Sequence, residues 1–259
     1  MKNKVRWIIG GTAALFLLLL GLGLFIKSSE TPFDFETVEH PEALVYLETE
    51  AWEDEFGAVS LQRPITRSAQ VNNDVWKHLQ AQAQHERRGW RKTEPQTAGR
   101  WMQITIRPSF INENLVSFLF CKAVYEGGAH PQETYYTISY DLATGKSWNL
   151  RRLFRDESAA PQRLMVAAKQ AMMQTGMDLV LDKGMIGEVI QPDMKSFRAY
   201  AWDGDILQII YDPGALAPYA EGEIVVPIRL YSIADALADD VHLPVKSFTV
   251  DTLEKFESE

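Results

Sequence analysis

The chain has 259 residues, a length that fits one sizeable domain or two small ones together with an anchor. Its apolar, aromatic and charged fractions are 46%, 11% and 24%, which are ordinary for a globular protein and argue against disorder. Residues 1–27 hold four of the 26 basic side chains and none of the 35 acidic ones, so the remainder carries a net charge of -13. This acidity argues against nucleic acid as a partner, because neutralising phosphates needs patches of Lys and Arg. It keeps an exported domain soluble, and it also suits a cationic partner.

The N-terminal run Trp7–Ile26 predicts the location of the protein. It is twenty residues long and uncharged, and at about 1.5 Å per residue a helix of that length matches a hydrocarbon core of about 30 Å. A cleaved signal peptide is the alternative, but its apolar core is usually only about 7–15 residues, followed by a small-x-small site that is missing here. Because Lys2, Lys4 and Arg6 precede the run, we expect a single-pass anchor in the inner or plasma membrane. The N-terminus would be cytoplasmic and the C-terminal domain periplasmic or extracellular.

Composition divides the rest of the chain into three parts. Residues 28–42 are polar and aperiodic, which indicates a linker. Residues 43–237 carry strand-like and helix-like patterns and form the predicted domain, loosely in two halves, 43–125 and 126–237. Residues 238–259 form an acidic tail. We expect an α+β fold, with two main helices packed on an antiparallel-rich sheet and one transmembrane helix before it.

Hydrophobic periodicity in the first half predicts two short strands and then a helix. Ala43–Glu50 and Ala58–Leu61 are strand-like, and Pro64 should limit the second strand because it has no N–H to donate. Asn72 or Asn73 would cap the helix. The apolar stripe of this helix consists of Val75, Trp76, Leu79 and Ala83.

Few side chains indicate metal or thiol chemistry. His78 and His85 lie seven positions apart, whereas zinc-binding helices typically place a pair four apart and add a third ligand. We therefore interpret both as surface residues and expect neither a metal nor a cofactor. The single cysteine, Cys121, excludes an intramolecular disulfide and lies in an apolar run, where we expect a buried, inert thiol.

Two strands are predicted before the middle of the chain. Trp101–Ile106 alternates, and Pro108 should end it. After a turn, Leu115–Tyr125 is a long apolar run that we place in the sheet centre.

The second half is predicted to continue the sheet and to add the second main helix. Thr134–Asp141 alternates as a strand, and a short turn at Ala143–Gly145 should follow it. Ser158 would cap the helix, with Pro161 in its first turn and Gly176 at its end. The predicted stripe of this helix is Leu164, Ala167, Ala168 and Ala171.

The last third of the predicted domain carries a hairpin, an edge strand and a short helix. Asp203-Gly204 lies between two β-rich runs and is the strongest hairpin signal in the chain. Pro227 marks the last strand as an edge or a bulge, and Ser232 would cap a short helix through Leu237.

The most individual signature is the run Tyr125–Pro131, with the sequence YEGGAHP. Two consecutive glycines supply positive φ or close backbone approach, so a turn between two strands is expected here. The residues that we assign to structural turns are Gly127, Gly128, Pro131, Gly145, Asp203 and Gly204.

This signature is followed by the segments YDLATGK and LRRLF, and later by the DGD hairpin and the EIVVPI strand. In these segments the chain resembles a known exported domain. It is similar to the extracellular region of the lysozyme-sensing anti-sigma-V factor and to the N-terminal region of some peptidoglycan deacetylases, over about Val45 to Leu237. The resemblance implies an α+β domain at the cell envelope. Only six residues precede the apolar run and no metal-dependent catalytic domain follows, so we expect neither the sigma-factor-holding part nor the deacetylase part.

Two functional hypotheses remain open. The first is a non-catalytic binding or sensing module that recognises peptidoglycan or a cationic envelope protein such as a lysozyme-like enzyme. The candidate binding residues are aromatic or acidic side chains near turns, which give large contact area at low entropic cost: Tyr125, Glu126, His130, Tyr135, Tyr219 and Glu221. The second is a cryptic cell-wall hydrolase that uses Glu126 and His130 as an acid–base pair.

Overall fold

The computed structural model of the chain describes residues 45–92, 99–239 and 251–252. The predicted anchor and linker, residues 1–42, lie outside these ranges, as does most of the predicted acidic tail. Within the described ranges, no helix combines the length and the apolar character that crossing a bilayer requires.

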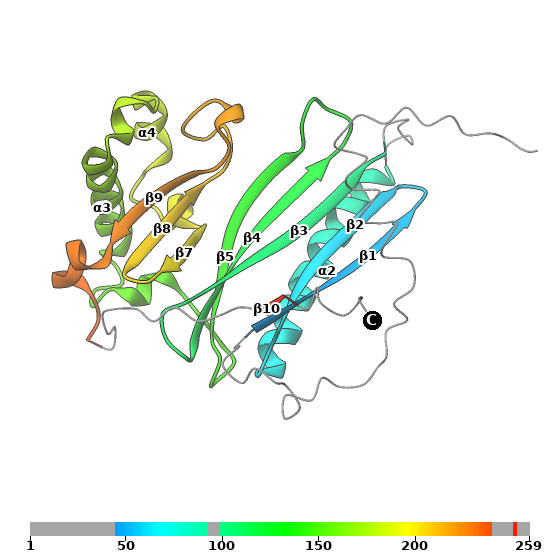
Figure 1. The fold of residues 1–259 in the computed structure, drawn as a ribbon, viewed down its shortest axis with the longest axis horizontal. Coiled ribbons are helices and arrows are strands. Elements are labelled where there is room, and N and C mark those ends of the chain that lie inside the picture. The colour runs from blue at the N-terminus through cyan, green and yellow to red at the C-terminus, as the bar shows by residue number, and fades with distance from the viewer. Residues whose placement is uncertain (1–44, 93–98, 240–250, 253–259) are drawn as a thin grey trace, which may run out of the picture. The chain divides into compact units, whose positions relative to one another are not determined.

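The described strands form two sheets, where the sequence predicts one (Figure 1). The larger sheet has the strand order β10 (Asp251–Thr252), β1 (Val45–Asp54), β2 (Gly57–Thr66), β3 (Trp101–Phe110), β4 (Leu115–Tyr125), β5 (Gln132–Asp141) and β6 (Lys146–Trp148). The smaller sheet has the order β7 (Tyr200–Asp203), β8 (Ile206–Tyr211) and β9 (Ile224–Arg229). Neighbouring strands are antiparallel except in the pairs β2–β3 and β1–β10. The prediction of an α+β, antiparallel-rich fold is therefore confirmed.

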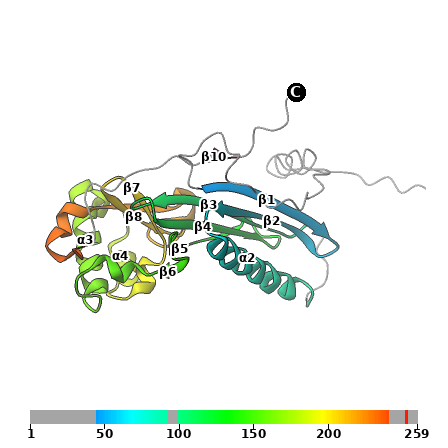
Figure 2. The same cartoon turned by 90° about the horizontal axis from the view of Figure 1, so that it is seen from below.

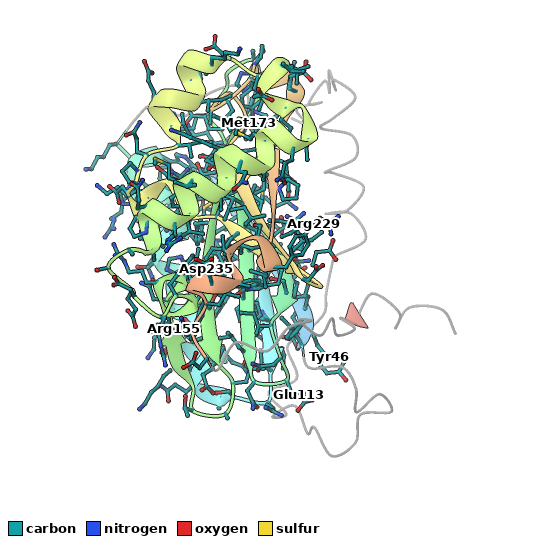
Figure 3. The ribbon with its side chains drawn as sticks, turned by 90° about the vertical axis from the view of Figure 1, so that its left-hand side faces the viewer. Tyr46, Glu113, Arg155, Met173, Arg229 and Asp235 are labelled. Carbon is teal, nitrogen blue, oxygen red and sulfur yellow. The ribbon has the colours of Figure 1, made fainter. Side chains whose placement is uncertain are left out.

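Each main helix packs on a different sheet. Helix α2 (Ala69–Trp90) links β2 to β3 and covers one face of the larger sheet (Figure 2). Helix α3 (Ala160–Thr175) packs on β9 of the smaller sheet, and the short α4 (Lys183–Val189) follows it. Figure 3 shows α3 from its outer side, where Met173 is 62% exposed. The described 3-10 helices are η2 (Leu150–Leu153), η3 (Met177–Leu179), η4 (Met194–Phe197), η5 (Tyr219–Glu221) and η6 (Leu230–Ala236).

The start of α2 differs from the prediction in its cap. Ser68 is the N-cap and accepts a hydrogen bond from the Val71 N–H. Asn72 lies inside the helix, where its Oδ1 accepts from the backbone N–H of Thr66 at 2.8 Å and from the Thr66 hydroxyl at 2.7 Å. The asparagine therefore ties the first turn to the end of β2. The predicted apolar stripe is confirmed by the burial of Val75, Leu79 and Ala83, with Trp76 partly buried beside them.

The predicted serine caps of the later helices are wrong. Ala159 precedes α3 without a side-chain cap, and the Ser158 hydroxyl donates to Asp156 at 2.7 Å. Ser232 lies inside η6 and donates to the Arg229 carbonyl. Gly176, with φ +72°, ends α3 as predicted, and Pro161 lies in its first turn. The predicted stripe of α3 is also buried: Leu164, Ala167, Ala168 and Ala171.

Two strands continue past the prolines that were expected to limit them. Strand β2 reaches two residues beyond Pro64, and β3 reaches two residues beyond Pro108. The pairing of β2 with β3 covers only Ala58–Leu61 and Trp101–Ile104. Both prolines therefore lie where their strand pairs on one side only, and a missing N–H costs little on an unpaired side.

A chain of buried polar side chains joins the two sheets. The Ser117 and Ser139 hydroxyls of β4 and β5 lie 2.7 Å apart, and both residues are at most 1% exposed. The Tyr200 hydroxyl lies 2.6 Å from Ser139, and the Trp202 indole N–H donates to Ser117 at 3.0 Å. Burial raises the pKa of Tyr200 to about 12. The smaller sheet thus packs on the face of β4 and β5 opposite α2.

Candidate functional site

The β4–β5 hairpin places Tyr135 beside Cys121. The two residues are register partners. Their neighbours Phe120 and Tyr136 belong to the core under α2, so Cys121 and Tyr135 point to the opposite face of the sheet, because side chains alternate along a strand. Tyr135 is 9% exposed and Cys121 is partly buried. Strand alternation predicts the face of each side chain, but only the pairing of β4 with β5 brings these two together.

The Tyr135 hydroxyl lies in a group of acidic and thiol side chains, which we call the tyrosine cluster: Cys121, Glu133, Tyr135 and Glu223. The hydroxyl donates to Glu133 Oε2 at 3.3 Å, and the Cys121 thiol and the Glu223 carboxylate also interact with it. Burial raises the pKa of Tyr135, and the hydrogen bonds with Cys121 and Glu223 add to the rise. Burial likewise raises the pKa of Cys121, with further contributions from nearby carboxylates. Both groups are therefore protonated at neutral pH, and the thiol is not an activated nucleophile.

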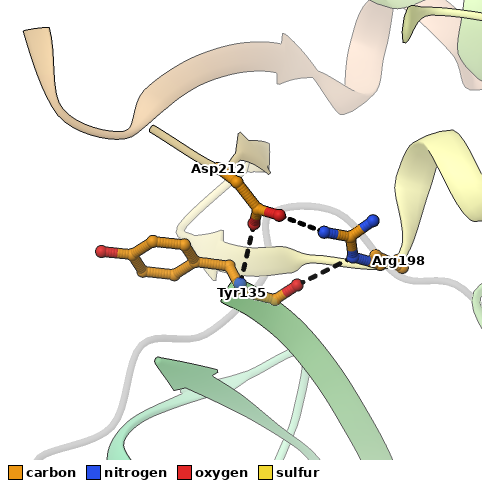
Figure 4. Close-up of polar contacts among 3 residues, drawn as sticks. All are labelled: Tyr135, Arg198 and Asp212. Atoms are coloured by element: carbon orange, nitrogen blue, oxygen red, sulfur yellow. Dashed lines mark hydrogen bonds and ion pairs between the residues drawn. The ribbon is translucent and has the colours of Figure 1, made fainter. Parts of the chain in front are cut away.

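Two charged residues hold the backbone of Tyr135 in place (Figure 4). Asp212 accepts a hydrogen bond from the Tyr135 N–H at 2.8 Å, and Arg198 Nε donates to the Tyr135 carbonyl at 3.1 Å. Asp212 and Arg198 also form an ion pair with each other. Because Asp212 opens the loop between β8 and β9, this ring of contacts fastens that loop to β5.

The same loop meets the YEGGAHP turn at a second point. The rings of His130 and Tyr219 are stacked, with centroids 3.7 Å apart and an interplanar angle of 19°. The Tyr219 hydroxyl donates to the Pro131 carbonyl at 2.6 Å. Two of the predicted binding residues, far apart in sequence, therefore form one aromatic pair, with His130 exposed and Tyr219 partly buried.

Within the described ranges, no hydrogen bond, ion pair or ring contact joins the other predicted binding residues to this pair. Tyr125 stacks on Trp101, with centroids 5.9 Å apart. Glu126 and Glu221 are exposed, and within the described ranges neither forms an ion pair. Among the described side chains, no hydrogen bond joins Glu126 to His130, and His130 Nδ1 lies 3.0 Å from the Pro131 carbonyl oxygen.

The residues assigned to turns behave differently from one another. Gly127, Gly145 and Gly204 have φ values of +94°, +67° and +57°, as a left-handed turn position requires. Gly128 has no such φ, so only the first glycine of the pair needs its conformational freedom. Asp203 and Gly204 form the predicted hairpin between β7 and β8.

Sequence reasoning missed several members of the site. Glu133, Asp212, Glu223 and Arg198 were not predicted as site residues. The alternation of β5 would have placed Glu133 on the same face as Tyr135, but no local signal points to the residues on β8 and β9. In the described ranges, no group of three or more His, Cys, Asp or Glu side chains has the arrangement of a metal site.

Solved structures supply a comparison for the whole fold. A DUF3298 family protein from Pseudomonas aeruginosa matches with a TM-score of 0.56 and 16% identity, over 78% of this chain and 97% of that one. A DUF3298 member from Bacteroides fragilis matches with a TM-score of 0.51 and 14% identity, over 75% and 92% of the two chains. The fold is DUF3298-like. No protein-family model and no curated protein matches the sequence. At these identities the DUF3298 likeness concerns the fold alone, and it assigns no activity.

Proposed function

We propose that the domain is a non-catalytic binding module at the cell envelope, and that its partner is a cationic envelope protein. A lysozyme-like enzyme is the partner that the resemblance to the anti-sigma-V factor implies. The envelope location rests on the predicted anchor Trp7–Ile26. The observation that carries the proposal is the stacked His130–Tyr219 pair, together with one exposed carboxylate in the same turn, Glu126, and one in the same loop, Glu221.

The aromatic pair is preorganised for contact. Tyr219 is held by its hydrogen bond to Pro131, and the loop that carries it is tied to β5 through Asp212. Little side-chain entropy is then lost when a partner covers the rings, and aromatic side chains are enriched among residues that dominate binding energy.

The charge of the surface favours a cationic partner over an anionic one. Glu126 and Glu221 carry negative charge that no ion pair in the described part of the chain neutralises. The net charge of -13 beyond residue 27 adds a long-range field of the same sign. Such a field raises association rates with cationic partners and is screened by salt.

The test is binding of lysozyme to the full-length chain in detergent, measured by calorimetry at low salt and at about 0.15 M salt. We expect saturable binding that weakens with salt. Reversing both exposed charges with Glu126→Lys and Glu221→Lys should weaken it by about tenfold or more. The matched control Glu157→Lys changes an exposed acid on another surface and should have little effect.

Two outcomes would overturn this version of the proposal: no binding at low salt, or equal weakening by the control reversal. The hydrolase alternative is tested in parallel, by release of soluble fragments from peptidoglycan. Release by the wild-type chain that His130→Ala abolishes would favour the hydrolase, and no structural contact in the described residues does so now.

A further inference from the structure

The outer side of α3 and the turn after it expose apolar side chains that the core does not use (Figure 3). Val166 and Met173 lie seven positions apart on the helix, hence on one side of it, and they are 51% and 62% exposed. Leu179, which ends η3, and Val180 after it are 78% and 82% exposed. In the described ranges, Tyr231 is the other large hydrophobic side chain that is exposed. We call Val166, Met173, Leu179 and Val180 the apolar patch.

The backbone fixes Leu179 and Val180 in their exposed position. Gly176 ends α3 with φ +72°, and the Leu179 N–H then donates to the Gly176 carbonyl at 3.2 Å. The Val180 N–H donates to the Met177 carbonyl at 3.1 Å. Met177 and Leu181 on either side pack against the core of the smaller sheet, so the two residues between them lie on the outside of the turn. Single exposed apolar side chains are normal, but a group of them indicates a contact with a partner or a membrane.

The segment that carries the apolar patch is neutral in an acidic chain. The basic side chains of residues 160–190 are Arg163, Lys169 and Lys183, and the acidic ones are Asp178, Asp182 and Glu188. The net charge of -13 over residues 28–259 therefore comes from the rest of that range. One of the three acids, Asp182, caps α4 by accepting from the Met185 N–H at 3.0 Å. An anionic surface is consequently repelled less by this segment than by the remainder of the chain.

Helix α3 itself contributes positive charge and no negative charge. Arg163 pairs with Asp235 at 3.5 Å. Within the described ranges, Lys169 forms no ion pair. Lys169 lies three positions after Val166 and four before Met173, so it shares their side of the helix. Exposed apolar side chains with a lysine among them are typical of helices that lie at a bilayer surface, where the long lysine stem lets the ammonium reach lipid phosphates.

The connection to the predicted anchor is long enough to bring this patch to a bilayer. Trp7–Ile26 would span the membrane, and the eighteen residues 27–44 join it to β1. Eighteen residues reach at most about 60 Å when fully extended. A compact domain of this size has a radius of gyration of about 16 Å, so the connection allows any of its faces to meet the membrane. Which face does so then depends on surface chemistry.

We propose that the apolar patch docks the domain onto the surface of the bilayer that holds its anchor. Leu179 and Val180 enter the boundary between headgroups and acyl chains, and Lys169 meets the lipid phosphates. This contact goes beyond the proposed protein contact, because its partner is lipid and it uses none of the residues assigned to that contact. It rests on the predicted anchor and not on a lysozyme-like partner.

The experiment places a fluorescent label at position 180 and asks whether lipids quench it. The full-length chain with Cys121→Ser and Val180→Cys is labelled and reconstituted into vesicles of phosphatidylethanolamine and phosphatidylglycerol, with or without a lipid that carries a nitroxide near its headgroup. We expect the nitroxide lipid to remove most of the fluorescence. The matched control is Tyr231→Cys in the same background, at a position that is 65% exposed in η6, and its label should keep its fluorescence.

A second pair of variants tests the patch itself. Leu179→Glu, added to the chain labelled at position 180, should abolish the quenching, because a carboxylate is costly to bury among acyl chains. Tyr231→Glu in the same labelled chain adds the same charge elsewhere and should leave the quenching unchanged. Equal quenching at positions 180 and 231, or quenching that Leu179→Glu does not reduce, would overturn the proposal.

Aqueous iodide separates lipid from a protein occupant. A label at position 180 that is shielded from iodide but not quenched by the nitroxide lipid would show that a protein surface, such as a second copy of the chain, covers the patch, and would also overturn the proposal. Quenching that persists in the chain with Glu126→Lys and Glu221→Lys supports docking on lipid, whatever the result with lysozyme.

Discussion

Gly127 and Gly128 are neighbours in sequence, but the backbone makes different demands on them. Gly127 has φ +94°, a region that side chains bearing a Cβ rarely adopt. Gly128 lies outside that region, and a Cβ built on it would meet only the His130 carbonyl oxygen, at an ordinary 3.7 Å. The turn that carries the candidate binding residues therefore depends on the first glycine of the pair.

This difference predicts unequal effects of two matched substitutions. Gly127→Ala should lower the free energy of unfolding by about 1–2 kcal/mol, because the alanine is strained at positive φ. Gly128→Ala should change it by less than about 0.5 kcal/mol. Urea unfolding followed by circular dichroism measures both values, and equal effects of the two substitutions would contradict the assignment.

Helix α2 meets the sheet through a histidine that the sequence pattern predicts at the surface. His78 Nε2 lies 3.1 Å from the Tyr136 hydroxyl, and its ring contacts Tyr136 edge-on with centroids 5.3 Å apart. Burial lowers the pKa of His78, because the imidazolium is poorly solvated between helix and sheet. The sequence did not predict the partial burial of His78, because this burial depends on where α2 lies on the sheet.

The lowered pKa predicts how stability changes with pH. The unfolded chain takes up a proton at His78 near the ordinary pKa of about 6.5, whereas the folded chain stays neutral to lower pH. The contribution is therefore fully present above about pH 6.5 and is lost as pH falls below it. Urea midpoints between about pH 7.5 and 5.5 should fall less steeply for His78→Gln than for wild type. His85→Gln, on an exposed residue of the same helix, should keep the wild-type slope; a wild-type slope in His78→Gln would contradict the prediction.

The two sheets are coupled through a buried polar junction as well as by apolar packing. Ser117, Ser139, Tyr200 and Trp202 satisfy one another's polar atoms across the junction. Leu119, Ala201 and Ile210 pack in the same layer. Separating the sheets would break the Tyr200–Ser139 and Trp202–Ser117 hydrogen bonds and expose this apolar layer, so the arrangement favours joint unfolding.

We therefore expect the described domain to unfold in one cooperative transition. Tyr200→Phe should lower the stability by about 1–3 kcal/mol without splitting the transition, because Ser139 loses a buried partner. Tryptophan fluorescence and far-ultraviolet circular dichroism should give coincident curves. Tyr231→Phe, at an exposed ring, serves as the control. Two separate transitions in the wild-type protein would show that the sheets unfold independently.

Local sequence signals were sufficient to predict several elements of the fold. Leu115–Tyr125 was predicted with the bounds that β4 has, and the hairpin at Asp203-Gly204 and the glycine end of α3 are also confirmed. These features depend on hydrophobic runs and on backbone preferences within a few residues. The prolines in β2 and β3 were misjudged because the cost of a proline depends on whether a neighbouring strand pairs there.

The sequence by itself determined the acidic charge, the periodicity of both main helices, the long strand β4 and the turn at YEGGAHP. Each of these features depends only on composition or on residues that are close in sequence. Only the tertiary structure decided that the strands divide into two sheets, that His130 stacks on Tyr219 and that Tyr135 meets Glu223. These contacts join residues that are distant in sequence. They follow from strand pairing and from the packing of one sheet on the other, for which no local pattern exists.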